Sequence, residues 1–65
     1  MDQIDSMTFV DRDSGDEAWL GVRAGSGLIS LAVSLKENGD YHVVFSPEEC
    51  ERLVSILEKA LLTAS

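Results

Sequence analysis

One amphipathic helix is predicted by residues 46–62, SPEECERLVSILEKALL. Ser46 is a favourable N-cap, Pro47 stands where a missing N–H costs nothing, and Glu49 follows the cap at the spacing of a capping box. At about 100° per residue, one side of this helix is apolar. That side consists of Cys50, Leu53, Val54, Leu57, Ala60, Leu61 and Ala64. Such a stripe needs an apolar surface to pack on, and we expect the preceding residues to supply it.

Four segments upstream have the alternation or the turn boundaries of β-strands. The clearest is residues 28–36, where large apolar side chains alternate with serine, alanine and lysine. Gly25-Ser26-Gly27 predicts a hairpin loop, and Asn38-Gly39 predicts a tight type I′ turn. The expected strands are 7–12, 17–24, 28–36 and 41–45.

These segments predict one domain over residues 7–65, with an α+β fold. A four-stranded antiparallel β-meander is followed by one C-terminal amphipathic helix (β-β-β-β-α), and the helix is expected to cover one face of the sheet. Residues 1–6 are polar and uncapped, so we expect them to be loosely ordered.

The chain has only 65 residues, which is short for an independent domain. A chain of this length buries only about 60% of the surface that its unfolded form exposes. Its single cysteine, Cys50, forms no disulfide within the chain, and one histidine, His42, adds no metal-ligand cluster. Self-association is the remaining way to bury apolar surface, so we expect a homodimer. The predicted dimer interface consists of Ile56, Ala60 and Leu62. The alternative is a monomer with a few exposed apolar residues.

Acidic residues outnumber basic residues by 12 to 5, which gives a net charge of -7. Most of the excess lies in the first seventeen residues, and a field of this sign repels nucleic acids and anionic membranes. A basic protein is the partner that it favours. The predicted partner-binding surface is Asp11, Asp13, Asp16 and Glu17. One form of this hypothesis is an inhibitor that occupies a nucleic-acid groove by imitating phosphate spacing; the alternative is that the acidity only maintains solubility.

The sequence has no signature of a catalytic, cofactor or metal site. His42 has neither a nucleophile elbow nor ligand spacing around it. The N-terminus lacks the basic and apolar regions of a secretory signal, and no stretch approaches the roughly 18 apolar residues of a membrane span. A lone thiol at Cys50 fits a reducing compartment. We therefore expect a cytoplasmic, non-enzymatic interaction or regulatory module without a cofactor.

The order of elements and the segment YHVVFSPEE, residues 41–49, resemble the small transcriptional coactivator domains that bind single-stranded DNA as dimers. Chains of that family also run from four strands into one helix, which opens with a Ser/Asn-Pro-Glu step. The resemblance covers residues 7–62 in topology and the helix entry in sequence. It implies an alternative function, the binding of single-stranded nucleic acid on a curved sheet with basic and aromatic side chains. The matching positions are Trp19, Arg23, Lys36 and Tyr41. A third hypothesis is a structural subunit of a larger assembly.

Overall fold

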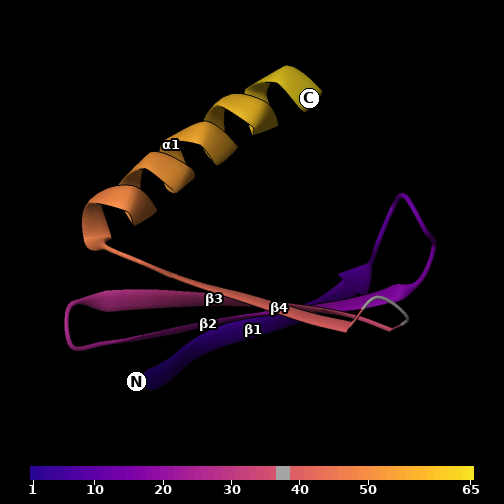
Figure 1. Cartoon of the computed structure of the whole chain (residues 1–65). Coiled ribbons are helices and arrows are strands. Elements are labelled where there is room, and N and C mark those ends of the chain that lie inside the picture. The colour runs from indigo at the N-terminus through magenta and orange to yellow at the C-terminus, as the bar shows by residue number, and fades with distance from the viewer. Residues whose placement is uncertain (37–38) are drawn as a thin grey trace.

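The computed structural model describes residues 1–36 and 39–65. Four antiparallel strands form one sheet in the order β1-β2-β3-β4, and one helix follows them (Figure 1). The elements are β1 Asp2–Val10, β2 Glu17–Gly25, β3 Leu28–Leu35, β4 Gly39–Phe45 and α1 Pro47–Ala64. The predicted α+β fold, a four-stranded meander followed by one C-terminal helix, is confirmed.

Helix α1 begins where the sequence predicts. The Ser46 backbone is extended (φ -74°, ψ 163°), and its Oγ accepts a hydrogen bond from the Glu49 N–H at 3.2 Å. In return, the Ser46 N–H donates to the Glu49 carboxylate at 2.9 Å. The pKa of Glu49 is lowered because the Ser46 N–H, and after it the Ser46 hydroxyl, stabilise the ionised carboxylate. This capping box fixes the first residue of α1 and the direction in which the chain leaves β4.

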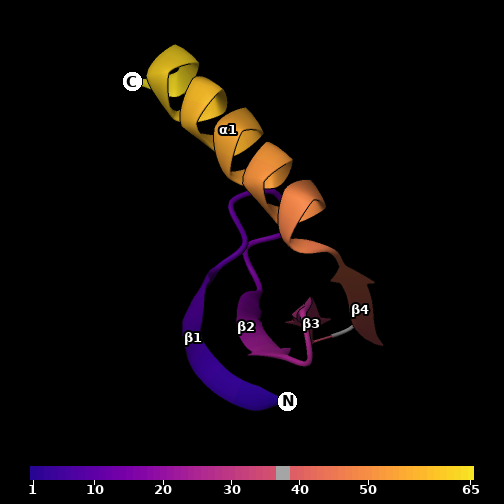
Figure 2. The same cartoon turned by 90° about the vertical axis from the view of Figure 1, so that its left-hand side faces the viewer.

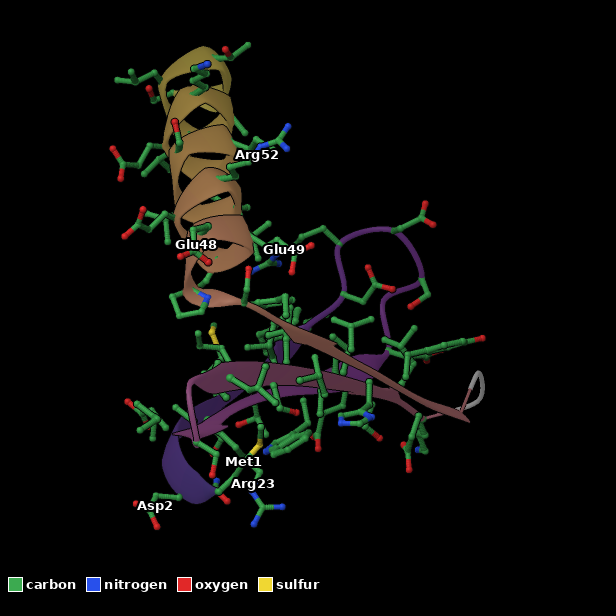
Figure 3. All side chains as sticks on the ribbon, turned by 60° about the vertical axis from the view of Figure 1, so that its left-hand side comes forward. Met1, Asp2, Arg23, Glu48, Glu49 and Arg52 are labelled. Atoms are coloured by element: carbon green, nitrogen blue, oxygen red, sulfur yellow. The ribbon has the colours of Figure 1, made fainter. Side chains whose placement is uncertain are left out.

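Strand β1 begins earlier than predicted. Residues 1–6 were expected to be loosely ordered, but the strand starts at Asp2, which lies opposite Ala24 of β2. The Arg23 guanidinium also donates a hydrogen bond to the Met1 carbonyl at 3.4 Å (Figure 3). Strand pairing uses backbone N–H and C=O groups, which polar residues carry as well as apolar ones, so residues 2–6 can pair with the edge of β2. The polar composition of this segment therefore gave no sign of the strand.

The hairpin loop predicted between β2 and β3 is present. Ser26 and Gly27 both have positive φ values, 55° and 74°, which is the pattern of a two-residue type I′ loop. Strands β3 and β4 pair antiparallel as expected. Of the type I′ turn predicted for Asn38-Gly39, Asn38 lies outside the described residues, and Gly39 has a positive φ of 79°.

The prediction that the helix covers one face of the sheet is wrong. Helix α1 leaves the end of β4 and rises away from the strands, so that its C-terminal end is far from them (Figure 1, Figure 2). Cys50 and Leu53, in its first two turns, are half-buried, and no residue of α1 is buried. Ser46 alone joins the strand to the helix, and its backbone is extended (φ -74°, ψ 163°).

One copy of the chain does not enclose a core. Among the described residues, the buried ones are Ala18, Gly21 and Ser30; Ala18 is 2% and Ser30 is 4% exposed. The accessible surface is 5273 Å², about 1,200 Å² more than the roughly 4,100 Å² expected of a compact monomer of 7.1 kDa. The Cα radius of gyration is 13.1 Å, the value expected for a compact chain of about 100 residues. Much apolar surface is therefore left for another molecule to cover.

Candidate interaction surfaces

The strand register gathers apolar side chains on one face of the sheet. Leu20 lies opposite Val33, and Val33 lies opposite Tyr41. We call this surface the sheet apolar face; it consists of Met7, Phe9, Ala18, Leu20, Val22, Ala24, Ile29, Leu31, Val33, Leu35, Tyr41, Val43 and Phe45. Its outer strands are open to solvent, with Met7 55% and Val43 53% exposed. An apolar surface thus spans all four strands without cover.

A second uncovered apolar surface runs along α1. We call it the helix stripe; it consists of Cys50, Leu53, Val54, Leu57, Ala60, Leu61 and Ala64. Because α1 rises away from the sheet, the stripe becomes more exposed toward its C-terminal end, where Leu57 is 58% and Leu61 is 71% exposed. A helix with a single apolar side gains most of its stability by packing that side against another surface.

The predicted dimer residues are all exposed on α1, but they do not form one surface. At about 100° per residue, Ala60 belongs to the helix stripe and Ile56 borders it. Leu62 lies on the other side of the helix, about 180° from Leu53. The structure therefore places two of the three residues beside the apolar stripe and separates the third from them.

The acidic turn, residues 11–17, joins β1 to β2. Asp11 organises this turn, because its carboxylate accepts hydrogen bonds from the Asp13 N–H at 3.0 Å and from the Ser14 hydroxyl at 2.9 Å. These two donors, the Asp13 N–H foremost, lower the pKa of Asp11 by stabilising its ionised form. The Gly15 N–H also donates to the Asp11 carbonyl at 2.8 Å. Asp11 is therefore a structural residue of the turn, a role typical of aspartate followed by serine and glycine.

The other three predicted partner-binding residues lie on the same turn. Asp13 and Glu17 are exposed and Asp16 is half-buried, and their carboxylates take no part in the hydrogen bonds that hold residues 11–17. Arg12 is the only basic residue within this range. The structure thus brings the predicted acidic surface together, with Asp11 holding its shape and the other carboxylates available for contact.

The opposite face of the sheet, which we call the polar face, carries one large side chain. The Trp19 ring lies over Gly21, and a Cβ atom at that glycine would collide with the ring. Two residues that are two positions apart in a strand share a face, so the sequence could have predicted this contact. Arg23 shares the face and points away from the side on which α1 rises (Figure 3). The polar face and α1 therefore lie on opposite sides of the sheet.

Of the four residues proposed for nucleic-acid binding, Trp19 and Lys36 border one hollow, and Arg23 lies further along the same face of β2. Trp19 and Arg23 lie on the polar face, and Lys36 borders a shallow hollow beside the Trp19 ring. Tyr41 pairs with Val33 on β3, so it belongs by register to the sheet apolar face, although it also reaches the edge of a second hollow. Trp19 and Tyr41 therefore belong to opposite faces of the sheet, so bases cannot stack on both rings along one flat face.

Carboxylates offset the basic residues of the polar face. Glu17 borders the same hollow as Lys36, and Asp40 borders the hollow on the other side of Trp19 together with His42. Proteins that bind single strands without sequence preference combine stacking rings with a positively charged groove. These two hollows lack a positively charged groove, because each is bordered by a carboxylate as well as by a basic residue or histidine.

Within residues 1–36 and 39–65, no three His, Cys, Asp or Glu side chains come together to hold a metal ion. The described chain also has no helix with the length and apolar character that crossing a membrane requires.

Comparison with known proteins gives no match, whether to a family model, to a curated protein or to a solved structure. The resemblance to coactivator domains remains a prediction from the order of elements and residues 41–49.

Proposed function

We propose that this chain is a non-enzymatic protein-interaction module that acts as a homodimer. The observation that supports this most strongly is the apolar surface that one copy leaves open, on the sheet apolar face and on the helix stripe. The accessible surface of one copy is about 1,200 Å² larger than that of a compact monomer of the same mass. Large contiguous apolar patches are rare on monomeric proteins and mark association surfaces. We therefore assign the open apolar surface to association with a second copy of the chain.

The acidic turn is the surface that we assign to a further partner, a protein with a basic contact surface. Asp13, Asp16 and Glu17 present carboxylates there; Arg12 is the basic residue within the turn, and Lys36 borders the same hollow as Glu17. The net charge of -7 attracts a basic surface at long range and repels phosphate. A protein that itself binds nucleic acid carries a surface of this kind, so inhibition of such a protein is the regulatory role that the charge fits best.

Light scattering tests the homodimer directly. Across a range of concentrations, the solution mass should be twice the 7.1 kDa of one chain, because only a second copy covers the open apolar surface. Circular dichroism on the same samples should show a folded chain. A folded particle of one copy that persists at the highest concentration would contradict the proposal.

Neutralising Asp13 and Asp16 tests the partner surface. The variant Asp13→Asn/Asp16→Asn should lower the affinity for a lysine-rich peptide by roughly 3- to 10-fold at low salt, and the difference should vanish at high salt. The matched control, Asp2→Asn/Glu51→Gln, removes the same charge from outside the acidic turn and should have a much smaller effect. Equal losses in the two variants would show that the acidity acts only through the net charge.

A further inference from the structure

We propose that a second copy of the chain fills the open angle between α1 and the sheet, so that the helix stripe of each copy packs on the sheet apolar face of the other. This arrangement rests on the homodimer proposed above and states how its two copies fit together. Helix α1 rises on the side of the sheet opposite to Arg23 and the polar face (Figure 3). The angle between helix and sheet is therefore bordered by two apolar surfaces.

The two surfaces match in length. Helix α1 has 18 residues and is thus about 27 Å long at 1.5 Å per residue. The strands have 7 to 9 residues and are about 23 to 30 Å long at 3.3 Å per residue. A helix laid along the sheet apolar face of the partner would therefore be supported over its whole length, including the exposed end around Leu61.

Only an exchange of helices covers both surfaces of each copy. Stacking two sheets face to face would leave both helix stripes in water, and pairing the two helices alone would leave both sheets open. A return of α1 onto its own sheet would require a different backbone at Ser46, where the capping box holds the extended conformation. When two copies exchange their helices reciprocally, the two contacts are related by a two-fold axis and the assembly closes at two copies.

The area that must be covered agrees with a dimer of this kind. One copy exposes about 1,200 Å² more than a compact monomer, so two copies would bury roughly 2,400 Å² on association. Obligate homodimers bury about 2,000 to 5,000 Å² in apolar interfaces, whereas weak encounters bury less than about 1,200 Å². The interface is thus of the size at which folding and association occur together.

The charges of α1 and of the central strands lie away from the two surfaces that this packing buries. The helix stripe carries no charge. The charged residues that the described register places on the side of the sheet apolar face, Asp2 and Asp5, lie on the edge strand β1 opposite Ala24 and Val22. On α1, the acidic side chains Glu51 and Glu58 lie about 140° to 160° around the helix from Leu53. When the stripe faces the partner's sheet, these two carboxylates face water, and Asp2 and Asp5 stay exposed if the helix lies over β2, β3 and β4 and leaves the edge strand β1 open.

The test uses the unmodified chain in two isotopic forms. Copies with ¹³C-labelled methyl groups are unfolded, mixed with unlabelled copies and refolded, and an isotope-filtered NOE spectrum then reports only contacts between copies. The methyl groups of Leu57 and Leu61 should contact those of Leu31 and Val33 in the other copy. The methyl groups of Leu62, on the other side of α1, should show no contact between copies and serve as the internal control.

The outcomes separate this arrangement from the homodimer on which it rests. A mass of two copies with contacts between copies only from sheet to sheet, or only from helix to helix, overturns the exchange and leaves the homodimer standing. A folded mass of one copy overturns both. A chain that stays unfolded alone at every concentration also overturns both, and it favours a subunit that folds only with a different protein.

Discussion

Replacing Leu57 by Asp should abolish both the two-copy particle and the fold. Leu57 is 58% exposed in one copy, so the change would cost a monomer no more than about 1 kcal/mol. Against the partner's sheet apolar face, it removes a buried leucine and buries an unpaired carboxylate, a loss of roughly 4 kcal/mol or more per chain. That loss approaches the whole stability of a small domain. Circular dichroism at micromolar concentration should therefore show an unfolded chain.

The matched control for this experiment is Leu62→Asp. Leu62 is 78% exposed and lies on the side of α1 that carries the acidic residues, so the same chemical change should alter the stability by less than about 0.5 kcal/mol. The solution mass of this variant should remain that of two copies. Equal effects at Leu57 and Leu62 would contradict the assignment of the helix stripe to the interface, and an effect at Leu62 alone would restore the interface predicted from the sequence.

The elements of this fold follow from local sequence, whereas their arrangement does not. Ser46 and Glu49 define the start of α1 through atoms three residues apart, and the alternation in residues 28–35 defines β3 in the same local way. The position of α1 depends on which surface covers its apolar side. Periodicity shows that a cover is needed, but it does not say whether the same chain or another one provides it. The expectation of a helix lying on its own sheet failed for that reason.

For the candidate surfaces too, groupings of residues close in sequence were predictable, whereas those that depend on strand register were not. Asp11, Asp13 and Asp16 are close in sequence, so their grouping on one turn was predictable, and the hydrogen bonds of Asp11 follow from ordinary turn chemistry. The separation of Tyr41 from Trp19 depends on the register of β4 against β3. A shift of one residue would exchange the two faces of that strand, and residue composition alone does not fix it.

The contact between the helix stripe and the partner's sheet can also be tested from the sheet. Replacing Leu31 by Ala should lower the free energy of unfolding by about 3 kcal/mol per chain. Leu31 lies in the middle of the sheet apolar face, opposite Val22 on β2 and Val43 on β4, and it is half-buried in one copy. When the partner's helix completes its burial, truncation leaves a cavity that packed neighbours cannot fill. Urea unfolding followed by circular dichroism measures this loss.

The comparison that makes the Leu31→Ala result specific is a second substitution on the same strand. Ala32 is the next residue on β3 and faces the polar side of the sheet, so Ala32→Ser should change the stability by less than about 0.5 kcal/mol. For a two-copy particle, the urea midpoint of both variants should rise with protein concentration by mass action. A loss near 1 kcal/mol at Leu31, with a midpoint that does not depend on concentration, would show that water and not a second copy lies on the sheet apolar face.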